Sequence, residues 1–504
     1  MKINSISTIG DLKKNGYKPI SIKNELRKNL IQALRKGENP FNGILGYDET
    51  VIPDIQTAIL SRHNIILLGL RGQAKTKIAR LLINLLDEYI PVIEGSELND
   101  DPLLPLSKIT KDLIAEHGDD TKISWLHRSE RYTEKLATPD VSVADLIGDV
   151  DPIKAATLKL PYSDERVIHF GLIPRSHRSI FVINELPDLQ ARIQVSLFNI
   201  LQESDIQIRG FKVRLPLDIQ FVFTANPEDY TNRGSIVTPL KDRIDSQILT
   251  HYPKTISVSK EITKQESDLS PEQCDTITRS ELLDNLVEQI AFEARQSEYI
   301  DSKSGVSARL TISAYENLIS TAERRMIINN ESGTSLRISD IYGVIPSLTG
   351  KIELVYEGEQ EGPSKVAYIL ISKAVKTLFQ DYFPSPEKIK KNQELNPYQS
   401  ISSWFSKGNT VDILNTISDK EYEKVLNSVP GLKEIVKKYH PRENIKDQLL
   451  LMEFVLHGLA EYSMLSKYKL EYGLQFKDML SSMFSINDED EDDQNITGTD
   501  NFYR

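Results

Sequence analysis

The chain reads Ile65-Ile-Leu-Leu-Gly69-Leu-Arg-Gly72-Gln-Ala74-Lys75-Thr76-Lys77 in the stretch that decides its fold. Four apolar residues precede a loop with two glycines, and a segment with apolar residues at helical spacing follows. A strand, a loop of the form Gly-x-x-x-x-Gly-Lys-Ser/Thr and a helix together make a phosphate-binding loop. The N–H groups and the dipole at the start of such a helix attract phosphate. The residues expected to bind ATP along this loop are Gly69, Gly72, Gln73, Ala74, Lys75, Thr76 and Lys77.

Two side chains of the loop have separate expected roles. Lys75 is expected to reach the β and γ phosphates as a point charge, and Thr76 to place its hydroxyl on Mg²⁺. The loop departs from the pattern at one place, because Ala74 stands where a glycine precedes the lysine. A Cβ atom there crowds the phosphates unless the backbone has a negative φ angle.

Two later apolar runs end in polar residues that suit ATP hydrolysis. Ile180–Ile183 is followed by Asn184 and Glu185, and Ile219–Thr224 by Ala225 and Asn226. Glu185 is the candidate general base. Asn184 stands where an Asp is usual, so its amide oxygen can accept from a Mg²⁺-bound water but brings no charge. For Glu185 the plainer alternative is an ordinary strand-end acid. Asn226 is expected to orient the attacking water, and for it the plainer alternative is an Asn-Pro turn.

Two arginines complete the candidate site. Arg243 lies in Pro-Leu-Lys-Asp-Arg-Ile, and Arg309 begins a helical stretch after Gly-Val-Ser-Ala. A lone Arg is usually solvated or paired at the surface. In an oligomeric ATPase, Arg243 can instead enter a neighbouring subunit's site and stabilise transition-state charge. Arg309 can contact the γ-phosphate from a helical lid.

The order of these parts resembles AAA+ ATPases, and most closely the magnesium-chelatase ATPase subunit and the related MoxR group. The stretches that carry the resemblance are 145–155, 171–189, 226–229 and 239–244. The resemblance implies that the residues matching Lys75, Thr76, Glu185 and Asn226 bind or hydrolyse ATP with Mg²⁺, and that Arg243 acts on the neighbour's nucleotide. It is specific over about 46–250, loose to about 385, and absent from 386–504.

The alternation of short β-rich runs with helical segments indicates a parallel α/β sheet. The expected fold class is an α/β P-loop AAA+ core with a parallel sheet, then a helical lid and a further helical C-terminal region. The expected parts are an N-terminal helical segment (1–45), the core (46–252), the lid (253–385), a helical region of unknown role (386–483) and an acidic disordered tail (484–504). Residues 205–217 alternate as a β-hairpin, and the resemblance places a further insertion at 154–170.

The composition of the chain excludes some kinds of site and argues against some functions. The chain has 504 residues, a net charge of −12 and a single cysteine, Cys274. A disulfide framework and a cysteine-based zinc or iron–sulfur site are therefore excluded, and general nucleic-acid binding is not indicated. No signal peptide and no membrane-length apolar run are visible. We expect a soluble, cytoplasmic protein.

The sequence thus predicts an ATP-driven motor that assembles with copies of itself as a ring, for which a hexamer is the expected size. The resemblance implies a partner with a von Willebrand A-type domain, and a task of remodelling a protein client or assisting metal insertion. Two alternatives stay open. One is a nucleic-acid motor resembling MCM helicases, which share the alanine-containing loop. The other is a nucleotide-gated scaffold with little turnover, because Asn184 can weaken Mg²⁺ binding.

Overall fold

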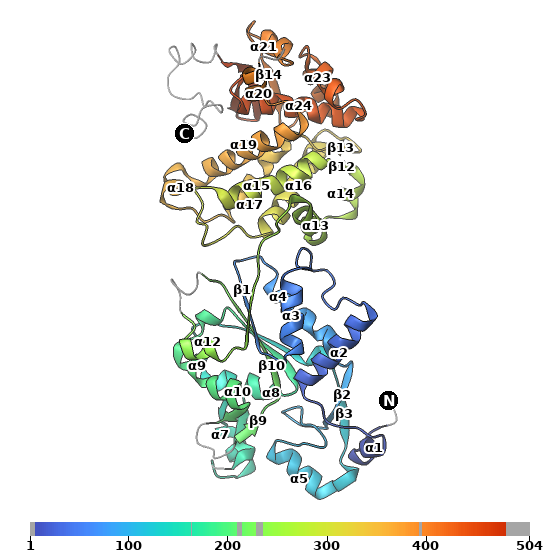
Figure 1. Ribbon diagram of the computed structural model, residues 1–504, viewed down its shortest axis with the longest axis vertical. Coiled ribbons are helices and arrows are strands. Elements are labelled where there is room, and N and C mark those ends of the chain that lie inside the picture. The colour runs from blue at the N-terminus through green and yellow to red at the C-terminus, as the bar shows by residue number, and fades with distance from the viewer. Residues whose placement is uncertain (1–5, 163, 209–213, 228–234, 393–395, 480–504) are drawn as a thin grey trace. The chain divides into compact units, whose positions relative to one another are not determined.

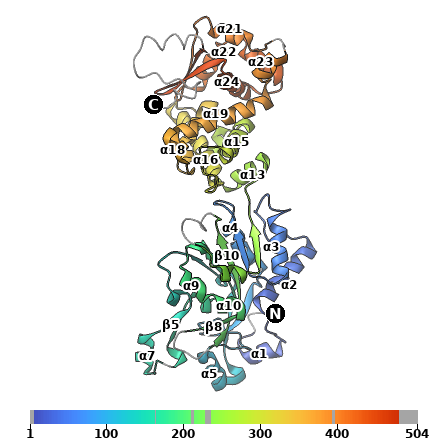
Figure 2. The same cartoon turned by 60° about the vertical axis from the view of Figure 1, so that its left-hand side comes forward.

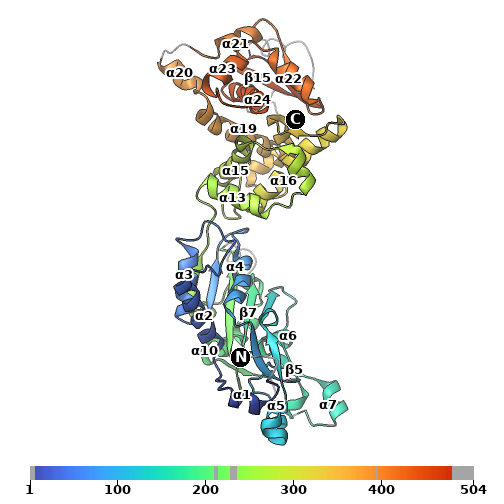
Figure 3. The ribbon, with the colours of Figure 1, turned by 90° about the vertical axis from the view of Figure 1, so that its right-hand side faces the viewer.

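The computed structural model describes residues 6–162, 164–208, 214–227, 235–392 and 396–479. The chain divides into two compact units, Met1–Tyr252 and Pro253–Arg504. Figures 1, 2 and 3 show the ribbon from three sides. The acidic tail expected at 484–504 and the turn of the expected hairpin lie outside the described residues. Among the described helices, none is both long and apolar enough to cross a membrane.

A five-stranded parallel sheet forms the centre of the first unit. Its strands, in order across the sheet, are β11 (Ser246–Leu249), β1 (Ile65–Leu68), β10 (Ile219–Ala225), β7 (Ser179–Asn184) and β4 (Tyr132–Leu136). β1, β7 and β10 are buried along their whole length, as continuous apolar runs in parallel sheets are when helices cover both faces. The expected parallel α/β fold is therefore confirmed.

Side chains of β7 alternate between two hydrophobic clusters. Ile180 and Val182 pack with the helices α2 (Ile22–Lys36), α3 (Val51–Leu60) and α4 (Lys75–Leu81). Phe181 and Ile183 pack with α9 (Ala191–Ser196) and α10 (Phe198–Glu203) on the opposite face. Figure 1 shows these two groups of helices on the two sides of the sheet. Because alternate residues share a face, Asn184 lies on the α4 side.

Several expected elements have different limits in the structure. The helical segment expected after the loop begins at Lys75 and ends at Leu81, where the chain passes into a 3₁₀ turn (Leu82–Leu85), and a strand begins at Tyr89. The helical segment after β7 is divided into α9 and α10. The other elements of this unit are α1 (Ile9–Lys14), β2 (Tyr89–Ile93), α5 (Lys108–His117), β3 (Ile123–His127), α6 (Val143–Leu146), β5 (Gly148–Val150), α7 (Pro152–Leu158), β6 (Ile168–Phe170), α8 (Leu172–Arg175), β8 (Asp205–Gln207), β9 (Arg214–Pro216) and α12 (Thr238–Asp242).

Both expected insertions correspond to distinct structures. β8 and β9 pair antiparallel, with Asp205 opposite Pro216, so the described part of the hairpin is confirmed. The insertion near 154–170 contains α7, which lies between the paired strands β5 and β6. Figures 2 and 3 show α7 at the periphery of its unit.

The second unit has one hydrophobic core that runs from Ile277 to Phe476. Its helices are α13 (Ile256–Glu266), α14 (Pro271–Thr276), α15 (Glu281–Gln296), α16 (Arg309–Ile328), α17 (Ile345–Thr349), α18 (Tyr356–Glu361), α19 (Pro363–Tyr382), α20 (Pro386–Asn392), α21 (Gln399–Phe405), α22 (Asp419–Asn427), α23 (Leu432–Tyr439) and α24 (Ile445–Glu461). The strands of its larger sheet, in spatial order, are β14 (Val411–Leu414), β16 (Gly473–Asp478) and β15 (Leu465–Leu470). The C-terminal region is thus helical as expected, but it also carries an antiparallel sheet that the sequence analysis missed.

The regions before and after residue 386 pack tightly on each other. A Cβ atom at Gly458 of α24 would overlap Cδ2 of Phe379 of α19, so glycine lets the two helices approach. The two helices lie side by side in Figures 1 and 3. Residues 253–479 therefore form one packed body rather than two loosely joined ones.

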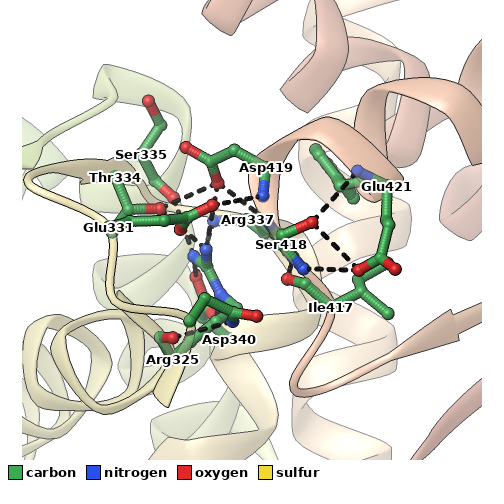
Figure 4. A network of polar contacts seen from close by, with 12 residues as sticks. Arg325, Glu331, Thr334, Ser335, Arg337, Asp340, Ile417, Ser418, Asp419 and Glu421 are labelled. Carbon is green, nitrogen blue, oxygen red and sulfur yellow. Dashed lines mark hydrogen bonds and ion pairs between the residues drawn. The ribbon is translucent and has the colours of Figure 1, made fainter. Parts of the chain in front are cut away.

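A buried ionic network also joins the two regions (Figure 4). Arg325 of α16 pairs with Asp340 at 2.9 Å and with Asp419 of α22 at 3.3 Å, and Arg337 pairs with Asp419 at 2.7 Å. The side chains of Arg325, Arg337 and Asp340 are at most 4% exposed. A charge buried this deeply needs its partners, because water cannot solvate it.

We expect Asp340→Asn to lower the free energy of unfolding of the second unit by about 3 kcal/mol, because it leaves Arg325 and Arg337 short of one buried counter-charge. Trp404 reports this transition in a Trp125→Phe background, since the chain has two tryptophans. Urea unfolding followed by fluorescence measures the change. Glu387→Gln, which removes an exposed pair with Lys376 at 3.5 Å, is the control and should change stability by less than about 0.5 kcal/mol.

Candidate functional site

The loop between β1 and α4 turns sharply at two left-handed residues. Gly72 has φ 72° and Ala74 has φ 57°. Ala74 therefore does not have the negative φ angle that would move its Cβ atom aside. A left-handed conformation costs an alanine about 1–2 kcal/mol. The usual pattern has a glycine at this position because glycine adopts the left-handed conformation without this cost.

Ala74→Gly should accordingly raise the free energy of unfolding of the first unit by up to about 1 kcal/mol, because glycine adopts this conformation without strain. Trp125 reports the first unit once Trp404 is replaced by Phe. Ala79→Gly, inside α4, is the matched control and should lose about 1 kcal/mol or more. Equal losses in both variants would show that Ala74 is not strained.

Polar side chains outside the loop hold it in place. A Cβ atom at Gly69 would overlap both Thr250 Oγ1 and Gln73 Oε1, so only glycine fits. The Thr250 hydroxyl donates to Gln73 Oε1 at 2.6 Å. The Tyr47 hydroxyl lies 3.1 Å from the carbonyl oxygen of Gln73, and burial raises the pKa of Tyr47 to about 12. Gln73 thus shapes the loop through its side chain and its backbone.

Lys75 lies inside the curve of the loop. Its ammonium group donates to the Gly69 carbonyl, to the Leu70 carbonyl at 2.9 Å and to Asn226 Oδ1 at 2.6 Å. The side chain is buried. The ammonium group is thus enclosed by acceptors of the loop and of Asn226. Thr76 and Lys77 follow on the half-exposed first turn of α4.

The carboxyl ends of three neighbouring strands bring the expected hydrolytic residues together. Asn226, after β10, donates from Nδ2 to Glu185 Oε2 at 2.9 Å. Glu185, after β7, has φ 55°, and its N–H donates to the Thr224 hydroxyl at 3.2 Å. Such a left-handed non-glycine residue at a strand end is a form of strain that occurs at functional sites. Lys75, Asn226 and Glu185 therefore form one continuous polar chain.

Asn184 makes contacts on both sides of its amide. Its Oδ1 accepts from the Thr224 hydroxyl at 3.0 Å, and its Nδ2 donates to Glu134 Oε1 at 2.6 Å. Glu134 lies on β4, and the Arg80 guanidinium and the Tyr132 hydroxyl also contact it. The sequence analysis missed Glu134. The sequence carried no signal for it, because Tyr132–Leu136 does not read as an apolar run.

The two arginines are not part of this polar chain. Arg243 donates to Gln202 Oε1 at 3.1 Å and to the Pro239 carbonyl at 2.7 Å, and its guanidinium lies 4.9 Å from the centre of the Phe198 ring. These contacts hold it half-buried on the first unit. Arg309 is exposed at the start of α16 in the second unit. Their roles in ATP hydrolysis remain predictions.

The residues present fit a nucleotide with Mg²⁺ better than a metal held by protein alone. Among the described residues, no group of three or more His, Cys, Asp or Glu side chains lies close enough to hold a metal ion. Mg²⁺ commonly takes only one or two protein ligands, with waters and substrate phosphates filling the other positions. Thr76 and Asn184 would be the protein side of such a site.

No family model matches the chain. Solved structures with a similar fold include a candidate ATPase from Cytophaga hutchinsonii, at 17% identity and a TM-score of 0.29, covering 70% of this chain and 96% of that one. They also include the complex of the magnesium chelatase subunits BchI and BchD, at 18% and 0.33, covering 64% and 98%. A closed-state structure of Hsp104 with ATPγS and casein has 13% identity and a TM-score of 0.35, covering 62% and 50%.

Likeness at these scores does not identify a reaction, so the geometry of the chain itself must carry the assignment. β1 lies between β10 and β11, and β7, which Glu185 follows, lies next to β10. The phosphate loop, its lysine and the two strand-end polar residues meet at one edge of this parallel sheet. The first unit therefore has a parallel α/β fold with a strand–loop–helix arrangement that fits the expected P-loop core.

Proposed function

We propose that this protein binds and hydrolyses ATP in its first unit and acts as a motor of the magnesium-chelatase and MoxR type. The single observation that supports this most strongly is the continuous contact from Lys75 through Asn226 to Glu185. A phosphate-binding lysine, a water-orienting amide and a carboxylate base are the parts that phosphoryl transfer to water needs.

Each of these groups has a distinct task. Lys75 would exchange its contacts with the loop carbonyls for phosphate oxygens when ATP binds. Glu185 would accept a proton from the attacking water, and Asn226, which contacts that carboxylate through Nδ2, would help to orient the same water. Bound Mg²⁺ would neutralise phosphate charge, with Thr76 and Asn184 as the residues that hold it or its waters.

Titration calorimetry with the purified full chain tests binding, and phosphate release tests turnover. We expect ADP and ATPγS to bind with micromolar affinity in the presence of Mg²⁺, and ATP to be hydrolysed. If neither nucleotide binds, the proposed function is wrong. If nucleotides bind without turnover, the scaffold alternative is favoured, for which the uncharged Asn184 is the supporting observation.

The assembly and the partner are the finer part of the proposal. We infer a ring of copies, in which Arg243 reaches the neighbour's nucleotide, and a partner with a von Willebrand A-type domain. The resemblance of residues 145–155 and 171–189 to the chelatase group supports this assignment. Mass spectrometry of proteins that co-purify with a Glu185→Gln variant tests it. A co-purified DNA fragment would instead favour the helicase-like alternative, which the net charge of −12 argues against.

A further inference from the structure

The proposed Mg²⁺ site has no negatively charged protein ligand. Thr76 and Asn184, the two residues proposed to hold Mg²⁺ or its waters, both have uncharged side chains. Mg²⁺ is a hard cation that prefers negatively charged oxygen. A neutral amide in the strand-end position therefore leaves the site without a formal protein charge, unless a nearby group supplies one.

Glu134 is the carboxylate that lies against Asn184. In the parallel pair of β4 and β7, Glu134 is opposite Val182, two residues before Asn184. Side chains two residues apart on a strand share a face, so Glu134 and Asn184 both lie on the side that α4 covers. Their contact is short, at 2.6 Å between Glu134 Oε1 and Asn184 Nδ2.

This contact fixes which end of the Asn184 amide carries the oxygen. A carboxylate accepts hydrogen bonds and cannot donate them, so the NH₂ end of the amide must face Glu134. The oxygen end then faces away from Glu134, where it accepts from the Thr224 hydroxyl at 3.0 Å and keeps a second lone pair. A water bound to a cation needs such an acceptor, and the opposite orientation of the amide would present donors to it.

The carboxylate itself is held in place by two further groups. Arg80 holds both carboxylate oxygens, because its Nε donates to Glu134 Oε2 at 3.0 Å and its Nη2 donates to Oε1 at 3.3 Å. The Tyr132 hydroxyl also donates to Oε2, at 3.1 Å. The Arg80 side chain is 63% exposed, whereas that of Glu134 is 23% exposed. Water and salt therefore screen the arginine charge more than the carboxylate charge. The arginine therefore offsets only part of the carboxylate charge.

We propose that Glu134 is a positioning residue that orients the Asn184 amide. From the neighbouring strand β4 it also supplies the negative charge that an aspartate at position 184 would supply directly. This inference rests on the proposed function, because it concerns the same nucleotide site. Partners that orient metal ligands in this way typically change metal affinity by 10–100-fold when they are removed.

The test is the Mg²⁺ requirement for ADP binding by the full chain, measured by calorimetry over a Mg²⁺ series and in EDTA. Glu134→Gln should raise the Mg²⁺ concentration for half-maximal effect about tenfold and leave ADP affinity in EDTA unchanged. An unchanged Mg²⁺ requirement would overturn the inference. If the unsubstituted chain binds no ADP in either condition, the proposed function fails first and the inference falls with it.

Arg80→Gln distinguishes the effect of the Glu134 charge from that of the Arg80–Glu134 ion pair as a structural contact. It removes the exposed partner and leaves the carboxylate, so the Mg²⁺ requirement should stay the same or fall, because a cation has been removed. If Arg80→Gln raises the requirement as Glu134→Gln does, the two side chains act only as a structural pair and the inference is wrong.

The double variant Asn184→Asp with Glu134→Gln decides the matter even if Glu134→Gln alone does not fold. It moves the negative charge from position 134 to position 184 and avoids two adjacent carboxylates. We expect its Mg²⁺ requirement to lie within about threefold of the original. A requirement tenfold lower than the original would show that Glu134 supplies no charge to the site in the natural sequence.

Discussion

Replacing Lys75 with alanine is expected to weaken ATP binding at least about 100-fold. The structure places this ammonium group within the curve of the loop, where it donates to Gly69, Leu70 and Asn226. In the bound state its donors would move to phosphate oxygens. Two charge-assisted contacts of this kind are worth about 3 kcal/mol together, which corresponds to about two decades of affinity.

The measurement is titration calorimetry with ATPγS on the full chain. Lys36→Ala, which changes an exposed lysine at the end of α2, is the matched control and should bind like the original chain. A circular dichroism melt checks that Lys75→Ala folds, because the variant leaves loop carbonyls without their donor. Equal affinity of the Lys75→Ala and Lys36→Ala variants would contradict nucleotide binding at this loop.

The second large effect concerns hydrolysis. Glu185→Gln should lower the rate of phosphate release by at least about 100-fold, because an amide cannot accept a proton from water, and positioned bases contribute roughly 10²–10⁴-fold. Nucleotide affinity should remain within a few-fold of the original. The glutamine that this change introduces has nearly the same shape as the glutamate, and its amide oxygen can still accept from Asn226 Nδ2.

Glu203→Gln, at the exposed end of α10, serves as the control for Glu185→Gln and should hydrolyse ATP at the original rate. A Glu185→Gln variant that retains full turnover would remove Glu185 from the mechanism. Equal and negligible rates in the original chain and the variant would instead support the scaffold alternative, provided that both still bind nucleotide.

The sequence was sufficient to predict that Lys75, Glu185 and Asn226 lie at one edge of a sheet, for a physical reason. Glu185 and Asn226 come at the ends of continuous apolar runs, and Lys75 ends the loop that follows a third run. Such runs become buried parallel strands. Parallel strands place their carboxyl ends at one edge of the sheet. Residues far apart in the sequence are therefore brought together without any knowledge of side-chain packing.

Glu134 was missed because its strand lacks that signal. β4 lies at the edge of the sheet, its residues are mostly half-buried, and it reads Tyr-Thr-Glu-Lys-Leu rather than as an apolar run. Its pairing with β7 is a long-range contact that periodicity does not encode. The neighbour of Asn184 therefore became visible only when the register was known.

The sheet in the second unit was also missed because its strands lack an apolar run. β15 reads Leu-Ser-Lys-Tyr-Lys-Leu, and its Lys467 is buried. Glu461 lies 2.6 Å from that ammonium group, and the Tyr342 hydroxyl lies 3.1 Å from it. A lysine normally indicates an exposed position. Only the paired carboxylate, contributed by the end of α24, explains why a charged residue is tolerated inside the core.

The close approach of Phe379 to Gly458 limits how the C-terminal third can be studied. A chain stopped after residue 385 would lose α24 and leave the aromatic face of α19 in water, so its aggregation would say nothing about biological role. Point substitutions on exposed positions of the same region, such as Tyr472, preserve the shared interior. Dissection by surface scanning, rather than by deletion, is the experiment that this architecture permits.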